Sequence, residues 1–266
     1  MVAIPNYKGF LAEDTDKSLI DLFSYVPKDG EPKIQWGRSV SKGCPVLPRV
    51  RNHMCYEALA GGFDGLLFID DDIGFNANEV YRMIGRGYGL IGAIPQKRNH
   101  KWNDPPSLAV PPPGVKYFKS DEGEYEVGIP PEPKLPMACT FIATQVLKDI
   151  DEAGLVPKYI YTPQSGQKAH CSQYFGYELV PAPEWSYEHQ VGKELGVENP
   201  MCEDGEDHYF CRRAAQAGYE SLIDVTVELR HWEGQVCHDY SYKKYLAENV
   251  AKMQAVEEAQ QVGEAA

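Results

Sequence analysis

The sequence lacks any hydrophobic run close to the roughly 20 residues that a transmembrane helix needs. Its first residues, Met-Val-Ala-Ile-Pro-Asn-Tyr-Lys, also lack the basic start and the long apolar core of a secretory signal peptide. We expect them to form an opening strand instead. These two absences predict a cytoplasmic protein without a transmembrane segment.

The sequence has no Cys-x-x-Cys pair among its seven cysteines. The count is odd and the positions are scattered, which argues against a disulfide framework and against a structural zinc site. We therefore expect reduced thiols. The seven residues are Cys44, Cys55, Cys139, Cys171, Cys202, Cys211 and Cys237.

Basic residues are outnumbered, with 26 Lys and Arg against 39 Asp and Glu and a net charge of −13. Neutralisation of phosphates supplies most non-specific affinity for nucleic acids, so this charge argues against broad nucleic-acid binding. It does not exclude a local basic groove. One candidate is the cluster Lys97-Arg-Asn-His-Lys-Trp102, which combines cations with an aromatic ring.

The 266 residues, 43% hydrophobic and 24% charged, are those of an ordinary globular protein that buries one sizeable core. Strand and helix patterns alternate over about the first 95 residues, which predicts an α/β fold with a parallel or mixed sheet. The expected strands are 2–5, 33–40, 66–69 and 90–94. The expected helices are 77–86, one ending at Gly61-Gly62, and one with N-caps from Asp14 to Asp16.

Proline-rich loops occupy residues 95–136, with a hairpin-like turn at Ser120–Gly123, and 154–202 is expected to be irregular and rich in aromatic residues. Those aromatic residues are suited either to lining a ligand pocket or to packing the loop. Further elements are expected at 137–144 (strand), 145–153 (helix), 206–218 (helix) and 222–229 (strand). We predict one domain over 1–240 and a polar helical tail over 241–266.

The most informative stretch is a short apolar run, Leu66–Ile69, followed directly by Asp70, Asp71 and Asp72. The run is typical of a strand buried on both faces. Asp70 and Asp72 are two residues apart, so in an extended chain they project to one side. Two such carboxylates suit Mg²⁺ or Mn²⁺ completed by substrate phosphates. The alternative is that these acids only cap the next helix and form a turn.

A second pair of acids, Glu206 and Asp207, opens the helix that ends at Gly218, and His231 follows the strand expected at 222–229. The helix dipole favours acids in a first turn, which explains the pair without any catalytic role. In the same way, His231 is explained by a histidine that finds a hydrogen-bond partner at a strand end.

Taken in order, these motifs resemble a nucleotide-sugar glycosyltransferase of the GT-A fold, and small bacterial and phage family-2-like members most. The resemblance covers about residues 2–235 and implies a Rossmann-like domain with a mixed, mostly parallel sheet and long acceptor-side loops. The matching motifs are the opening Ile4-Pro5, Arg51-Asn52, Leu67-Phe-Ile-Asp-Asp-Asp72, Gly92-Ala-Ile-Pro-Gln-Lys97, Gly205-Glu-Asp-His-Tyr-Phe-Cys-Arg-Arg-Ala214 and Leu229-Arg-His231.

The resemblance implies a role for each matched residue. Asp70, Asp72 and His231 would hold Mn²⁺ or Mg²⁺ against the donor diphosphate, and Asp207, beside Glu206, would be the general base of an inverting transfer. The donor would be a nucleoside-diphosphate sugar, with a UDP-sugar expected first. The acceptor would be a glycan, a small molecule or a hydroxylated base in phage DNA. The residues expected to contact the donor are Pro5, Tyr7, Arg51, Asn52, Asp70, Asp71 and Lys97.

Several alternatives stay open at this point. A second acidic pair, Glu203-Asp204, competes with Glu206-Asp207 for the base role, and the pattern fits inverting and retaining chemistry alike. A sugar-nucleotide nucleotidyltransferase is a second function, although it should carry a Gly-rich basic loop where Asn6-Tyr-Lys-Gly9 stands. A third is a non-catalytic nucleotide- or glycan-binding relative. The oligomeric state is open.

Overall fold

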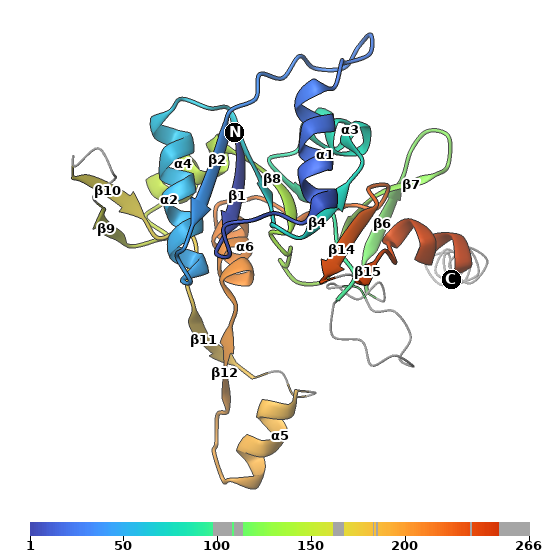
Figure 1. Ribbon diagram of the computed structural model, residues 1–266. Helices are drawn as coiled ribbons and strands as arrows, with labels where there is room; N and C mark the ends of the chain where they lie inside the picture. Colours follow the sequence, from blue (N-terminus) through green and yellow to red (C-terminus); the bar gives the residue numbers. More distant parts are fainter. Residues whose placement is uncertain are drawn as a thin grey trace.

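An eight-stranded mixed sheet organises the chain in the computed structural model, which describes residues 1–97, 108, 114–161, 168–182, 184, 186–234 and 236–249. The strand order is β2-β1-β3-β8-β5-β13-β7-β6 (Figure 1), and only β7 and β8 run against the other six. The expected mixed, mostly parallel sheet is confirmed. The strands are β1 Val2–Asn6, β2 Arg38–Lys42, β3 Gly65–Ile69, β5 Leu90–Gly92, β6 Lys116–Lys119, β7 Tyr125–Ile129, β8 Cys139–Ala143 and β13 Leu222–Asp224.

Helices cover both faces of this sheet. Helices α1 (Glu13–Ser24) and α3 (Ala77–Gly85) pack on one face, while α2 (Leu47–Ala60), α4 (Thr144–Glu152) and α6 (Glu206–Gln216) pack on the other. Side chains alternate accordingly along β3, because Leu67 and Ile69 join the α1 side and Leu66 and Phe68 the α2 side. The buried strand before the aspartates is thus confirmed.

A smaller sheet, in the order β15-β14-β4, lies just beyond the end of β3. Its strands are β4 Ile73–Phe75, β14 Leu229–Glu233 and β15 Val236–His238. A Cβ atom on Gly74 of β4 would lie 1.8 Å from a carboxylate oxygen of Asp14, so only glycine lets β4 approach α1 this closely. The strand expected at 222–229 is therefore two strands, one in each sheet.

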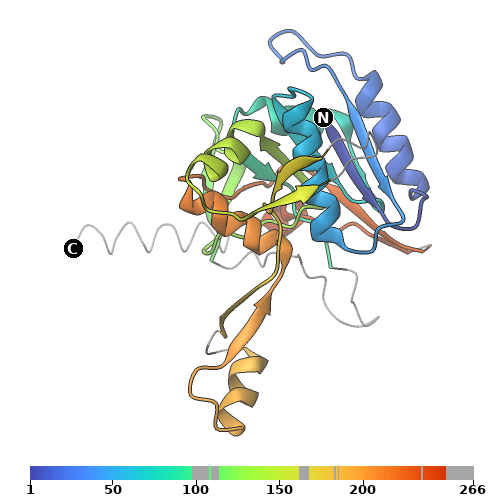
Figure 2. The same cartoon turned by 90° about the vertical axis from the view of Figure 1, so that its left-hand side faces the viewer.

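The described residues between 154 and 202, expected to be irregular, form strands and a helix instead. Strands β9 (Lys158–Tyr161) and β10 (Ala169–Ser172) make a hairpin beside α2, and β11 (Glu178–Pro181), α5 (Tyr187–Glu194) and β12 (Met201–Asp204) make an arm that projects from the body (Figure 2). Glu178 at the base of the arm accepts hydrogen bonds from Arg212 and Arg213 of α6. Short strands with polar faces hide the period-2 pattern that reveals longer ones.

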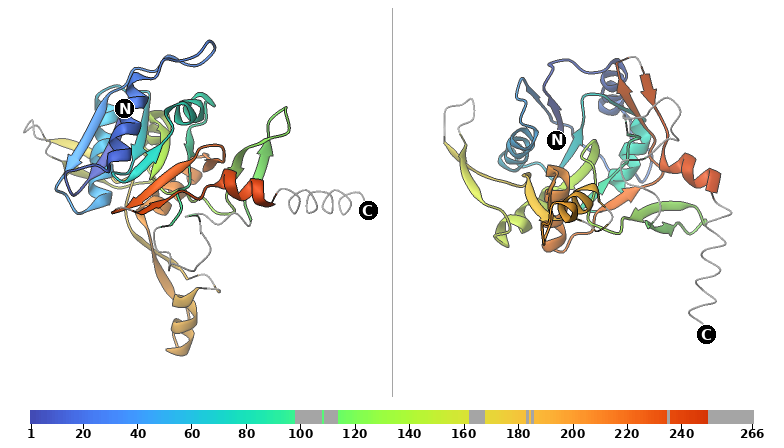
Figure 3. Two further views of the ribbon diagram at one scale, coloured as in Figure 1. Left: turned by 45° about the vertical axis from the view of Figure 1, so that its right-hand side comes forward. Right: turned by 90° about the horizontal axis from the view of Figure 1, so that it is seen from below.

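The remaining elements agree with the sequence in kind more than in bounds. The hairpin β6–β7 turns at the expected Ser120–Gly123. Residues 242–249 are helical and lie beside that hairpin (Figure 3), with the rings of Tyr117 and Tyr242 centred 6.2 Å apart. All seven cysteines are free, and no helix within the described ranges is long and apolar enough to cross a membrane.

Candidate active site

Three carboxylates converge on the buried guanidinium of Arg51. Its Nη1 lies 2.6 Å from Oε1 of Glu206 and also contacts Oδ1 of Asp207, and its Nη2 lies 3.3 Å from Oδ1 of Asp70. Arg51 is only 1% exposed, and the rings of Phe68 and Phe175 flank its guanidinium at 5.8 Å each. This Arg51 cluster joins the start of α6 to the end of β3 through α2.

Charge in the Arg51 cluster is unbalanced, with one cation among three acids. Burial raises the pKa of Asp70, and the charges of Asp207 and Asp72 add to this, although Arg51 opposes it. Burial and Asp207 likewise raise the pKa of Glu206 against the effect of Arg51. Burial would lower the pKa of Arg51, but the three carboxylates outweigh it and raise that pKa. The cluster therefore favours a further positive charge nearby.

Asp72 and His231 face each other beside this cluster. Oδ1 of Asp72 lies 3.5 Å from Nε2 of His231, and Nδ1 of His231 lies 2.8 Å from the carbonyl oxygen of Gln96. A carbonyl only accepts, so Nδ1 carries the proton in the neutral ring and Nε2 presents a lone pair toward Asp72. Histidines that bind metals are commonly held in this way, with the other ring nitrogen donating to a backbone carbonyl.

Strand β14 holds His231 by its two neighbours. Alternate residues of a strand point to opposite sides, so Arg230 and Trp232 project away from His231. Both donate to Asp14 of α1: Nε and Nη2 of Arg230 lie 2.7 and 3.1 Å from its oxygens, and Nε1 of Trp232 lies 2.9 Å away. The backbone N–H of Trp232 also donates to the carbonyl of Asp72 at 2.9 Å. We call Asp14, Arg230 and Trp232 the β14 clamp.

The side chains near Asp72 make up an incomplete ligand set for a divalent cation. Within the described ranges, no group of three or more His, Cys, Asp and Glu side chains is gathered as a complete metal site. An oxygen of Asp72 and a nitrogen of His231 lie 3.5 Å apart, while Asp70 contacts Arg51. Mg²⁺ is usually held by only one or two protein carboxylates and completed by phosphates and water, so this pair fits an ion that a substrate completes.

The residues expected to contact the donor are not all brought together. Asn52 is 3% exposed, and its side-chain amide donates to and accepts from the backbone of Phe175, at 2.8 Å each. Arg51 is enclosed in its cluster. Both side chains belong to α2 and thus form part of the wall of the site. Direct contact of either with a donor stays a prediction.

The other expected donor residues lie along the edge of the sheet. Pro5 is buried in β1, and Tyr7 just after it is 61% exposed. The carbonyl of Asp71 accepts from the N–H of Ala12 at 2.8 Å. Lys97 is exposed and follows Gln96, whose carbonyl holds His231. The rest of the basic cluster, 98–102, lies outside the described residues.

The two acidic pairs have different surroundings. The carboxylate of Asp204 lies 2.7 Å from Nδ1 of His208 and also pairs with Arg212, so it fixes the base of the arm. The side chain of Asp207 is 24% exposed, belongs to the Arg51 cluster and accepts from the N–H of Met137 at 3.1 Å. Of the two pairs, Glu206-Asp207 is the one beside Asp70.

Sequence reasoning missed the β14 clamp and the anchoring carbonyl of Gln96. Asp14 was interpreted as a helix cap, but α1 begins at Glu13, and the carboxylate of Asp14 is used by Arg230 and Trp232. The available signal was the alternation Arg-His-Trp just after the strand expected at 222–229, because a strand continued through these residues places the first and third side chains on one face. The role of Gln96 could not be predicted in this way, because every residue has a backbone carbonyl.

Comparisons with known proteins add little. No protein-family model matches the chain, and no curated protein matches its sequence. Among solved structures, the crystal structure of A197 from STIV is similar at a TM-score of 0.46 and 12% identity, over 91% of this chain and 90% of that one. A TM-score below 0.5 supports no inference about function, so function has to be inferred from the side chains of the site.

Proposed function

We propose that this protein is a metal-dependent glycosyltransferase that moves a sugar from a nucleoside-diphosphate sugar to an acceptor hydroxyl with inversion. The observation that carries the proposal is the pairing of Asp72 with His231, whose Nε2 lies 3.5 Å from Oδ1 of the carboxylate while Nδ1 lies 2.8 Å from the carbonyl oxygen of Gln96. The neighbouring Arg51 cluster supplies a carboxylate, Asp207, for proton transfer.

Asp72 and His231, with Asp70 beside them, would hold Mn²⁺ or Mg²⁺. Such an ion, when bound, supplies positive charge that stabilises the departing nucleoside diphosphate. The excess of acids around Asp70 supports this assignment, because a cation would oppose the burial and the repulsion by Asp207 and Asp72 that together raise the pKa of Asp70. The β14 clamp would keep His231 at the ligand position.

Asp207 would serve as the general base. The acceptor oxygen attacks the anomeric carbon, its proton passes to Asp207, and the bond from that carbon to the diphosphate oxygen breaks with its electron pair leaving on the diphosphate. Arg51 and the N–H of Met137 fix the carboxylate, which leaves little freedom for it to turn away. A general base must lie within hydrogen-bond reach of the proton that it takes, so this fixed position suits Asp207 for the role.

The donor is expected to be a UDP-sugar. The exposed ring of Tyr7 is available to stack on its uracil, and the exposed Lys97 is available to bind its phosphates. A nucleotidyltransferase remains the second candidate, because the same metal ligands would serve it. The acceptor classes named above, including a hydroxylated DNA base, remain predictions.

Hydrolysis of UDP-glucose, UDP-galactose and UDP-N-acetylglucosamine tests the proposal, assayed with Mn²⁺, with Mg²⁺ and with a chelator. We expect free sugar and UDP to form only with metal, and the reaction to be nearly abolished in Asp72→Asn. Asp121→Asn, an exposed acid in the β6–β7 turn, is the matched control and should retain it. Release of UMP with sugar phosphate would favour the nucleotidyltransferase. Full activity in Asp72→Asn would place the metal elsewhere.

A further inference from the structure

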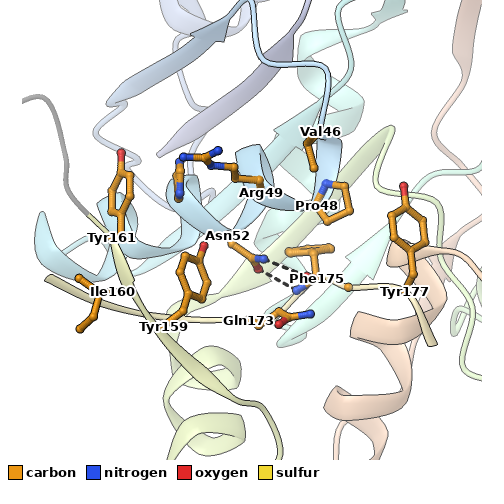
Figure 4. Close-up of a pocket in the computed structure, with 12 residues that line it drawn as sticks. Val46, Pro48, Arg49, Asn52, Tyr159, Ile160, Tyr161, Gln173, Phe175 and Tyr177 are labelled. Atoms are coloured by element: carbon orange, nitrogen blue, oxygen red, sulfur yellow. Dashed lines mark hydrogen bonds between the residues drawn. The ribbon is translucent and has the colours of Figure 1, made fainter.

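A pocket of about 520 Å³ lies between α2 and the β9–β10 hairpin, a part of the chain with no role in the chemistry above. We call it the α2–hairpin pocket. Figure 4 shows Tyr159 and Tyr161 on one side of it, Tyr177 on the opposite side, and Pro48 and Phe175 between them. Its lining combines aromatic rings with a few polar groups, the composition typical of small-ligand sites.

This pocket shares two walls with the Arg51 cluster. Asn52 lines the pocket and is the next residue after Arg51 on α2. Phe175 also lines it, and its ring lies 5.8 Å from the guanidinium of Arg51 and stacks on Phe210 of α6 at 4.8 Å. Burial raises the pKa of Tyr177, and the charges of Glu206, Glu203 and Asp207 add to this while Arg51 opposes it. A ligand in the pocket would therefore extend toward the carboxylate proposed as base.

The aromatic rings differ in what they offer a ligand. Tyr161 stacks on His53 with ring centres 3.7 Å apart, so that face of Tyr161 is already covered. Tyr177 is 53% exposed and takes part in no aromatic pair within the described part of the chain. A pyranose has an apolar face of C–H groups and a rim of hydroxyls, which suits a tyrosine with an apolar ring face and a polar tip.

Charge narrows the choice of ligand. Arg49 contributes the one fully charged side chain among the lining residues, and the lining contains no carboxylate, in a protein whose net charge is −13. Within the described ranges Arg49 is exposed and makes no ion pair. Burial, with Arg49 nearby, lowers the pKa of His53, so His53 is a neutral hydrogen-bonding group there. A local cation in an acidic protein favours an anionic ligand.

Resting on the glycosyltransferase function proposed above, we propose that the α2–hairpin pocket binds the acceptor, and that the acceptor carries a pyranose ring with an anionic substituent. Tyr177 would pack against the ring near the reacting hydroxyl, and Arg49 would pair with the anion at the far end. The anion is either a sugar carboxylate or a sugar phosphate, since both present oxygen atoms that a guanidinium binds in two-point contact.

Three probes separate the contribution of the pyranose ring from that of the anionic substituent: methyl β-glucuronide, glucose 6-phosphate and methyl β-glucoside. Each is titrated into the full chain, and binding is followed by saturation-transfer NMR. We expect the wild type to bind at least one of the acidic rings more tightly than the neutral glucoside, and the tighter of the two identifies the anion. Arg49→Gln should weaken binding of the acidic ring at least fivefold and leave binding of the glucoside unchanged. Tyr177→Ala should weaken both by a similar factor.

Tyr88→Ala, an exposed tyrosine outside the pocket, is the control and should change nothing. The proposal fails if the wild type binds none of the three probes, if the neutral ring binds as well as the acidic ones, or if neither pocket variant alters binding. Donor hydrolysis by the wild type is measured separately. If the wild type binds an acidic ring but shows no metal-dependent hydrolysis, the glycosyltransferase function is overturned and the binding site is not. If it hydrolyses the donor with metal but binds none of the rings, the pocket assignment alone is overturned.

Discussion

Asp14 and Arg230 are 216 positions apart in the chain, and their side chains form a two-point ion pair, with Nε–Oδ2 at 2.7 Å and Nη2–Oδ1 at 3.1 Å. Trp232 donates to the same carboxylate. Because the residue between them is His231, this contact sets the direction in which β14 presents the histidine to Asp72. Asp14, which has no part in the proposed chemistry, thus positions one of the expected metal ligands.

Asp14→Ala should weaken metal-dependent donor hydrolysis and destabilise the fold. Three N–H groups lose this acceptor, and because they are only partly buried the cost should lie near the lower end of the roughly 1–3 kcal/mol for an unpaired buried donor. Titration of Mn²⁺ should show weaker metal activation, since His231 is no longer held. Asp21→Ala, an exposed acid on the same helix, is the control and should behave as the wild type. Unaltered metal dependence in Asp14→Ala would show that β14 is held by its backbone pairing alone.

The β14 clamp should also give a defined pH dependence. Burial alone would raise the pKa of Asp14, but hydrogen bonds from Arg230 and Trp232 and the charge of Arg230 outweigh it and bring that pKa below 3.8. A carboxyl with a lowered pKa in the folded state adds stability above its ordinary pKa, and loses it as the pH falls through the folded value. The stability difference between wild type and Asp14→Asn should therefore be constant at neutral pH and shrink below about pH 3.8.

Urea unfolding at a series of pH values measures that difference. Comparison with Asp14→Asn removes the titration of every other group from the result, because those groups are common to both proteins. A difference that grows as the pH falls would mean that burial, and not the ion pair, dominates the pKa of Asp14.

Asp207→Asn should lower transfer at least about a hundredfold, the scale for loss of a positioned acid or base. Binding of the donor should survive, because Asp72 and His231 are untouched. Asp204→Asn is the matched variant: its carboxylate serves His208 and Arg212, so it should lose stability at the base of the arm but keep transfer once folded. Normal transfer in Asp207→Asn, or a product with retained anomeric configuration, would remove Asp207 from the base role.

The sequence predicted the parts of the fold that depend on local pattern. The run Leu66–Ile69 is apolar throughout because both its faces are covered, and α6 starts at Glu206 as its acids and apolar spacing indicated. The carboxyl end of β3 also follows from strand direction, so the place of Asp70 and Asp72 could be foreseen. These features need only a few neighbouring residues.

What the sequence did not reveal depends on contacts between distant residues. Arg51 was expected at the donor, but three acids from β3 and α6 converge on it, and no spacing rule encodes that meeting. The arm β11–α5–β12 was missed because its strands are four residues long and their faces are mixed. Charge pairing across the fold can be inferred only when the topology is known.

Arg51→Met tests the Arg51 cluster most directly. Methionine fills a similar volume but leaves Asp70, Glu206 and Asp207 without their counter-charge, and removing one partner of a buried ion pair costs about 3–5 kcal/mol. Arg49→Met, exposed on the same helix and outside any ion pair within the described residues, should change stability by less than about 0.5 kcal/mol. Urea unfolding at neutral pH compares the two.

The loss in Arg51→Met should shrink as the pH falls. Burial and repulsion already raise the pKa of Asp70 and of Glu206, and the guanidinium of Arg51 opposes both. Without it these two pKa values rise further, so the folded state binds protons more tightly than the unfolded chain. Stability of the variant therefore rises as the pH falls from neutral toward those pKa values. Arg51→Lys should lie between the two proteins, because an ammonium restores the charge but not the fork that reaches three acids at once. If Arg51→Met proves as stable as the wild type at neutral pH, the acids are already protonated or solvated there, and Arg51 does not hold the site together.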